Sequence, residues 1–188
     1  MTRLRTRLAG LALLALSACA MFSSRPGVPD FDLLGRVFVG YEGPSFSSSL
    51  RWSHAGGEDQ IWLMTPLGQT VAYIEDTPNG ATLTGADQQQ YNAASVESLT
   101  RRALGWSLPL AQLRYWVRGQ EVPDVPASGV QRAPDGQLLE LTQAGWQITF
   151  TPPAPHVANR LPRRLQLTNG SQQIRLVIDE WRAVAPGP

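Results

Sequence analysis

The sequence predicts a mainly β fold with inserted helices, and three observations carry this prediction. Apolar residues recur at every second position along most of the chain, which is the period of a strand with one buried face. Asn79-Gly80, Asp135-Gly136 and Asn169-Gly170 lie between such runs, and Asx-Gly pairs tolerate the positive φ of tight hairpins. The period becomes helical once, between about Ser95 and Arg118. We therefore expect an antiparallel meander of about 10 to 11 strands, interrupted by a helical pair.

The first residues resemble a bacterial secretory signal that ends at a lipidation site. Three arginines precede an apolar run from Leu8 to Leu16, which is too short to span a membrane. The run ends in Leu16-Ser17-Ala18-Cys19, which resembles the lipobox, where a peptidase cuts before a cysteine that then carries lipid. We expect residues 1–18 to be a signal peptide and Cys19 to be lipid-modified. The alternative is an ordinary secretory signal with an incidental cysteine.

The rest of the chain is expected to be one tethered domain. Residues 19–29 are rich in serine, proline and glycine and predict a flexible tether, residues 30–182 the folded domain, and residues 183–188 a tail. Ala20 follows the cysteine, which resembles lipoproteins sent to the outer membrane, so we expect the periplasmic face of that membrane. Without the signal, 13 basic and 15 acidic side chains remain, which argues against a nucleic-acid partner.

Strands are expected from about Leu33 onward, and the side-chain alternation assigns their faces. Phe46, Ser48, Leu50 and Trp52 would share one face of a strand. The same alternation groups Val37, Val39 and Tyr41; Val71 and Tyr73; Trp146, Ile148 and Phe150; Leu161, Leu165 and Leu167; and Ile174, Leu176 and Ile178.

Two helices are expected between these strands. Ser95 can cap a first helix that Gly105 ends, and Pro109 suits the first turn of a second helix that ends near Gly119, before a loop over 120–128. A curled apolar sheet open to water is unstable, so the helices would cover an unclosed half-barrel as a lid. Such an arrangement leaves an apolar cavity that suits lipid-like ligands.

Short motifs along the whole chain, taken in order, resemble those of a known family. They are Gly35-Arg36-Val37, Leu50-Arg51-Trp52, Pro66-Leu67-Gly68-Gln69, Leu104-Gly105, Leu108-Pro109-Leu110, the run 113–119, Gln143-Ala144-Gly145-Trp146, Leu161-Pro162 and the run 176–181. With the lipobox, this set resembles the LolB family of outer-membrane lipoprotein receptors.

The resemblance implies a LolA/LolB-like half-barrel under a helical lid and a transport role. Such a protein accepts lipoproteins through their acyl chains from the periplasmic carrier LolA and inserts them into the inner leaflet of the outer membrane. The expected partners are therefore LolA, the acyl chains of cargo and leaflet lipids, and the expected state is a monomer. The alternative function is an accessory outer-membrane lipoprotein that binds protein partners or cell wall without lipid transfer.

The segment Pro66, Leu67, Gly68 is a candidate membrane-insertion loop. Proline presets the first corner of a turn and glycine suits its last position, so Leu67 lies near the tip. The alternative is a plain turn whose leucine folds back onto the sheet. The resemblance favours the first reading, because the family carries a membrane-engaging leucine on a protruding loop.

Broad apolar side chains are the candidates for the wall of the acyl-chain cavity, because they offer large contact surfaces with few rotamers. The alternative for each is a core residue that fills space. The candidates are Leu50, Trp52, Tyr73, Leu110, Leu113, Trp116, Trp146, Ile148, Phe150 and Trp181.

Nothing in the sequence points to catalysis, a cofactor or a metal site. His54 and His156 fall in expected loops, and neither Gly-x-Ser-x-Gly nor His-Glu-x-x-His occurs. The acidic pairs Glu58-Asp59 and Glu75-Asp76 are interpreted as solvated edges and turns, since neighbours on a strand face opposite ways. A lipid hydrolase that uses a histidine is the rival enzyme hypothesis. The helix arginines, Arg114 among them, are expected to be solvated, with contacts to acidic groups of cargo or carrier as the alternative.

Overall fold

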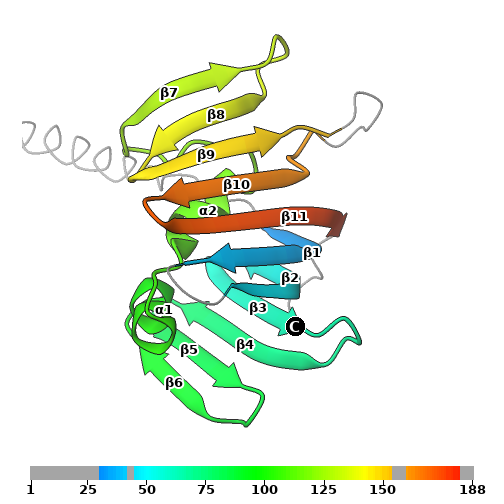
Figure 1. The fold of residues 1–188 in the computed structure, drawn as a ribbon, viewed down its shortest axis with the longest axis vertical. Coiled ribbons are helices and arrows are strands. Elements are labelled where there is room, and N and C mark those ends of the chain that lie inside the picture. Colours follow the sequence, from blue (N-terminus) through cyan, green and yellow to red (C-terminus); the bar gives the residue numbers. More distant parts are fainter. Residues whose placement is uncertain (1–29, 42–44, 154–159, 183–188) are drawn as a thin grey trace, which may run out of the picture.

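Eleven strands form one open antiparallel sheet in the computed structural model, which describes residues 30–41, 45–153 and 160–182 (Figure 1). The strand order is β6-β5-β4-β3-β2-β1-β11-β10-β9-β8-β7, so β6 and β7 are the two edges. The strands are β1 (Phe31–Gly40), β2 (Phe46–Ala55), β3 (Glu58–Met64), β4 (Thr70–Thr77), β5 (Gly80–Gly85), β6 (Gln90–Ala93), β7 (Ala127–Arg132), β8 (Leu138–Gln143), β9 (Trp146–Thr151), β10 (Arg164–Asn169) and β11 (Gln172–Arg182). The predicted fold class is confirmed.

The first and last strands meet at the centre of the sheet. β1 pairs with β11 from Asp32↔Arg182 to Gly40↔Gln173, and on its other side with β2. Gly35 lies at a bulge in the β1–β11 pairing, and a Cβ built there would lie 2.2 Å from the carbonyl oxygen of Val177. The close approach of the two backbones therefore requires glycine.

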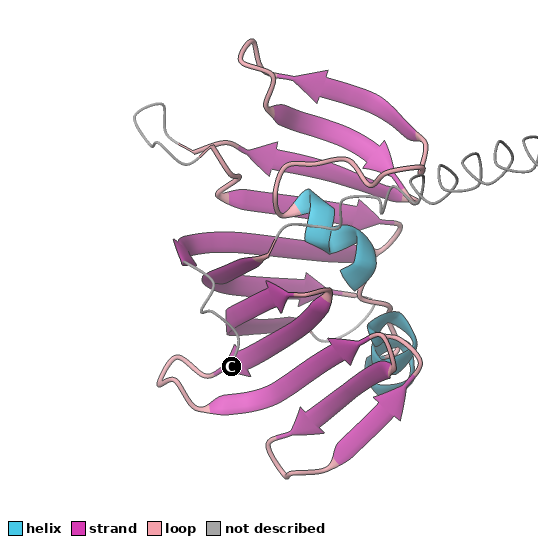
Figure 2. Cartoon of the chain, turned by 180° about the vertical axis from the view of Figure 1, so that it is seen from behind, coloured by secondary structure: helices cyan, strands magenta, loops and turns pink. Residues whose placement is uncertain are grey.

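Two short helices cover one face of the sheet, as the view from behind shows (Figure 2). Helix α1 (Val96–Leu104) has Ser95 as its N-cap, whose side chain accepts from the Ser98 N–H, and Gly105 at φ 78° as its C-cap. Both caps are as predicted. Helix α2 (Leu110–Trp116) follows Pro109 and ends about a turn before the expected Gly119. No helix in the described ranges is long and apolar enough to cross a membrane.

The three Asx-Gly pairs close hairpins as predicted, between β4 and β5, β7 and β8, and β10 and β11. Their glycines have φ of 136°, 85° and 56° in chain order. The alternation is also confirmed in β9, where Trp146, Ile148 and Phe150 are buried and the residues between them are exposed.

The alternation fails in two places. A bulge between Leu63 and Met64 skips Val71, so Val71 and Tyr73 do not share a face. Val71, Ala72 and Ile74 line the cavity, whereas Tyr73 does not. β10 begins at Arg164, so Leu161 belongs to the preceding connection. Irregular pairing shifts the period of two by one residue, and local sequence does not reveal such a shift.

Candidate functional site

An apolar cavity of about 470 Å³ lies between the covered face of the sheet and the two helices. Its wall is contributed by β1 to β5 and β11, by both helices and by the segment that joins them. Among the lining residues only Ser45 and Thr100 carry a hydroxyl, and the others are aliphatic, aromatic or glycine. The cavity therefore suits a hydrocarbon ligand and offers almost nothing to a polar one.

The cavity opens to the surface at the start of β2. Ser45 and Phe46 are exposed, whereas every other lining residue is buried or half-buried. Trp52 lies six residues further along the same strand, roughly 20 Å from Phe46 at the rise of a strand. The lining thus extends from an open mouth beside Phe46 to a deep end beside Trp52.

Four of the ten predicted cavity residues line it, namely Leu50, Trp52, Leu110 and Leu113. The other six, Tyr73, Trp116, Trp146, Ile148, Phe150 and Trp181, do not. Tyr73 packs its ring 5.3 Å from that of Trp62, which also lies outside the lining, and Trp181 packs 5.9 Å from Phe31.

Trp116, Trp146, Ile148 and Phe150 belong to a part of the core that is filled. Trp116 Nε1 donates to Gln143 Oε1 at 2.9 Å, and the same oxygen accepts from the Val122 N–H at 2.9 Å. The Gln143 amide donates in turn to the carbonyls of Val122 and Val125. The segment after α2 is thereby held over β8.

Several lining residues were not predicted as such. Val37, Val39, Ile174 and Leu176 line the cavity, and their strand alternation already indicated a buried face. Trp106 and Leu108 also line it, from the segment between the helices, and no periodicity marked them because that segment is irregular.

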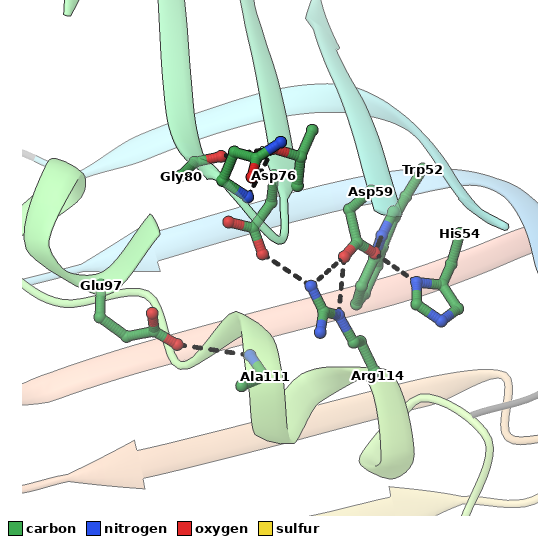
Figure 3. A network of polar contacts seen from close by, with 10 residues as sticks. Trp52, His54, Asp59, Asp76, Gly80, Glu97, Ala111 and Arg114 are labelled. Carbon is green, nitrogen blue, oxygen red and sulfur yellow. Dashed lines mark hydrogen bonds and ion pairs between the residues drawn. The ribbon is translucent and has the colours of Figure 1, made fainter. Parts of the chain in front are cut away.

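A buried polar cluster begins at Trp52, at the deep end of the cavity. Figure 3 shows its contacts. We call it the Arg114 cluster, and it comprises Trp52, His54, Asp59, Asp76 and Arg114. Asp59 Oδ1 accepts from Trp52 Nε1 at 2.6 Å and lies 3.0 Å from His54 Nδ1. Arg114 Nε donates to Asp59 Oδ2 at 2.6 Å, and a terminal guanidinium nitrogen donates to Asp76 Oδ2 at 2.6 Å. The cluster ties α2 to β2, β3 and β4.

Burial determines the electrostatics of the Arg114 cluster. The side chain of Asp59 is fully buried, and those of Asp76 and Arg114 are 18% and 19% exposed. Burial raises the pKa of the Asp76 carboxyl above its ordinary value; Arg114 opposes that rise, and the carboxylates of Asp59 and Glu97 add to it. The single positive charge of Arg114 therefore compensates the negative charges of two largely desolvated carboxylates, those of Asp59 and Asp76.

These contacts correct three sequence-based interpretations. His54 lies on β2 and is buried rather than in a loop, and His156 falls outside the described residues. Asp59 and Asp76 are ion-paired inside the protein rather than solvated. Arg114 binds these two carboxylates instead of facing solvent, cargo or carrier. Within the described part of the chain, no three His, Cys, Asp or Glu residues are grouped so as to hold a metal ion.

The segment between the helices, residues 105–109, is held by a few single contacts. We call it the connector. The Leu108 N–H donates to Thr100 Oγ1 at 2.9 Å, and Arg101 Nε donates to Ser107 Oγ at 2.9 Å. From the sheet, Gln172 Nε2 donates to the Ser107 carbonyl at 3.1 Å. The connector is therefore less firmly tied to the sheet than α2 is.

The predicted loop between β3 and β4 is a tight turn with an outward leucine. The Gly68 N–H donates to the Thr65 carbonyl at 2.9 Å, the Thr65 N–H donates to the Gln69 carbonyl at 2.8 Å, and Gly68 has φ 83°. Leu67 is 88% exposed, so it does not fold back onto the sheet. Cys19, the predicted lipidation site, lies outside the described residues.

Comparisons with known proteins agree on one family. The family model described as outer membrane lipoprotein LolB matches residues 29–181. The outer-membrane lipoprotein LolB of Thiobacillus denitrificans is 38% identical over 186 residues, which cover 94% of this chain and 98% of that protein. The LolB of Nitrosomonas europaea is 37% identical over 154 residues, covering 81% and 72%.

Solved structures give more distant matches. A LolA superfamily protein from Nitrosomonas europaea matches with a TM-score of 0.46 at 8% identity, over 87% of this chain and 90% of that one. A DUF1329 family protein from Desulfovibrio piger matches with a TM-score of 0.49 at 7% identity, over 81% and 85%.

Proposed function

The chain belongs to the LolB family of outer-membrane lipoproteins, and from that premise we propose that it accepts lipoproteins through their acyl chains from a LolA-type carrier and inserts them into the outer membrane. The observation that carries this proposal is the open apolar cavity between sheet and helices. Membership of a family of lipoprotein-transport proteins agrees with the expectation that the chain is not an enzyme.

The size of the cavity supports a single acyl chain as its ligand. If a methylene takes about the 30 Å³ that one water takes in the liquid, then 470 Å³ holds roughly 16 methylenes. The distance of roughly 20 Å from Phe46 to Trp52 is similar to the ~15 Å of hydrocarbon in one leaflet. Each methylene taken from water contributes about 0.8 kcal/mol, so the affinity should rise with the length of chain that the cavity encloses.

Delivery needs a contact with the membrane, and we assign this to the turn at Pro66, Leu67 and Gly68. An exposed leucine contributes only about 2 kcal/mol on burial, so Leu67 would disturb the bilayer locally without anchoring the protein. We assign the permanent attachment of the protein to acyl chains on Cys19, at the periplasmic face of the outer membrane. Since two or three chains hold a protein stably where one does not, that anchor would be permanent.

The affinity for the acyl chains would increase from the carrier to this protein and from this protein to the bilayer. Each transfer step requires such a difference in affinity between the site that releases the chain and the site that takes it. The rival proposal, an accessory lipoprotein that binds partners without lipid transfer, gives no role to an open cavity with an apolar wall.

A transfer assay tests the proposal. A LolA-type carrier loaded with a labelled lipoprotein is mixed with this protein in liposomes, and cargo is measured on carrier, receptor and lipid. We expect cargo to reach the lipid. With Leu67→Glu we expect acceptance from the carrier to persist and release to the lipid to fall about tenfold or more.

Val130→Glu is the matched control, because Val130 is also exposed and apolar but lies on the edge strand β7. It should transfer cargo as the unchanged protein does. Absence of transfer with the unchanged protein would contradict the proposed function, and normal release with Leu67→Glu would contradict only the role of the turn.

A further inference from the structure

The exposed large apolar side chains of the described residues are concentrated at one edge of the sheet. They are Tyr41, Phe46, Leu67, Tyr91 and Val130, with exposed fractions between 40% and 88%. All except Val130 lie along the border of the sheet that is formed by strand ends, where β1, β3 and β5 end and where β2, β4 and β6 begin. We call this the mouth edge, because the cavity opens there beside Phe46.

The strand register places Phe46 and Tyr91 on the face of the sheet that carries the cavity. Tyr91 pairs with Leu83, and Val39 pairs with Phe46; Leu83 and Val39 both line the cavity. Residues directly opposite each other on paired strands share a face, so Tyr91 lies on the covered face of the sheet, as Phe46 does. Tyr41 comes two residues after Val39, just beyond the end of β1.

Charge is distributed unequally between the two edges. In the described turns at the mouth edge, namely 65–69, 86–89, 144–145 and 170–171, Asp87 is the one charged residue. At the opposite edge, the described turns carry Asp135, Arg160 and Arg163. An apolar surface with tyrosines, whose turns carry little charge, is typical of the contact between a protein and the boundary of a membrane.

We propose that the whole mouth edge is a docking surface for a lipid bilayer, with Leu67 entering the hydrocarbon and Tyr41 and Tyr91 lying at the level of the headgroups. The inference rests on the proposed function and extends it from one leucine to a surface. Tyrosine suits this level because its ring is apolar and its hydroxyl is polar.

This docking would bring the cavity mouth directly against the lipid. Phe46 lines the cavity and is exposed at the same edge, so it is continuous with both the apolar wall and the proposed contact. An acyl chain could then move from the cavity to the bilayer without exposing its methylenes to water. Avoiding that exposure removes the main barrier to transfer, since the cost of exposure grows with every methylene.

Depth-dependent fluorescence quenching tests the proposal on the full-length protein in liposomes of phosphatidylethanolamine and phosphatidylglycerol. An environment-sensitive label is attached to Tyr41→Cys, Tyr91→Cys, Leu67→Cys or Val130→Cys, and a lipid with a quencher in its tail is added. Cys19 is the one native cysteine and is expected to carry lipid, so it should not react. We expect quenching at positions 41, 67 and 91 and none at position 130.

Two results would overturn the proposal. In one, the labels at 41 and 91 respond as the label at 130 does. In the other, these two labels are shielded only when the soluble carrier is added, which would make the mouth edge a protein-docking surface. Lipoprotein transfer is measured on the same samples: normal transfer with unquenched tyrosine positions contradicts the docking surface alone, whereas failed transfer by the unchanged protein contradicts the proposed function.

A double substitution gives an independent readout. In Tyr41→Glu/Tyr91→Glu, delivery to liposomes should fall about tenfold while uptake from the carrier persists, because neither residue lines the cavity. Val130→Glu should leave both steps unchanged, and equal delivery by the double variant and this control would contradict the proposal.

Discussion

At the scale of single residues, Gly35 is where the sheet tolerates least change. A Cβ at this position would meet the Val177 carbonyl oxygen at 2.2 Å, and neither backbone can move without disturbing the central pair of strands. We expect Gly35→Ala to lower the free energy of unfolding by about 1–3 kcal/mol through overpacking. Urea denaturation measures this.

Gly40→Ala is the control for that prediction, because it lies in the same strand and its Cβ would meet only the Phe38 side chain, at 3.3 Å. A similar loss in both variants would show that strand propensity, and not the close backbone approach, decides the effect.

Arg114 is expected to contribute to stability far more than a surface arginine. Arg114→Met would leave the fully buried Asp59 without a cation, which typically costs about 3–5 kcal/mol. Arg36→Met is the matched control, since Arg36 pairs with Asp179 where both side chains are exposed, and solvent screening makes such a surface pair contribute far less to stability. Equal effects in chemical denaturation would contradict the structural role of the cluster.

The sequence could not predict the Arg114 cluster. Its ion pairs join residues 55 and 38 positions apart, and adjacent carboxylates on a strand look the same whether they face solvent or a buried guanidinium. Leu67 could be predicted, because the turn that presents it is specified by its own two neighbours.

At the scale of elements, α2 and the connector differ in how they are held. Helix α2 is fixed by the Arg114 cluster and by the hydrogen bond of Trp116 to Gln143, whereas the connector contacts β11 through Gln172. We therefore expect the connector, and not α2, to move when an acyl chain enters.

Substitution of Gln172 tests this difference. Gln172→Ala removes the hydrogen bond to Ser107, so a fluorescent fatty acid should dissociate severalfold faster, while the free energy of unfolding changes by only about 1 kcal/mol. Stopped-flow fluorescence measures the rate. Gln166→Ala, an exposed substitution on β10, is the control, and equal rates in the two variants would contradict a mobile connector.

Helix limits could be predicted better than strand faces. Ser95 and Gly105 act through contacts within one turn, so their signal is local. The face of Tyr73 depends on a bulge whose position is set by the pairing of two strands, and no residue type marks it.

At the scale of the whole molecule, the covered sheet could be predicted but the location of the cavity could not. Alternation and Asx-Gly turns specify strands and hairpins, and amphipathic helices specify a cover. Whether space beneath the cover stays empty depends on side chains meeting from distant segments, as Trp116, Val122 and Gln143 do on the filled side.

Filling the cavity should abolish lipid binding without unfolding the protein. Leu83 lines the cavity and is half-buried, so Leu83→Trp should occupy part of the 470 Å³ and lower the affinity for a fatty acid about tenfold or more. Native mass spectrometry should show about one bound chain in the unchanged protein and fewer in the variant. Leu139→Trp, half-buried on β8 and away from the cavity, should bind normally; unchanged binding by Leu83→Trp would contradict the assigned site.

The meeting of β1 and β11 has a consequence for biogenesis. Ile174 and Leu176, which complete the cavity wall, lie on β11, the last of the described strands, so a nascent chain carries an unfinished pocket until β11 has been synthesised and has paired with β1. Contacts of such long sequence separation also slow folding, which keeps the chain unfolded for longer. A chain with this topology therefore acquires its affinity for lipid late in folding, when the first and last described strands of the sheet have paired.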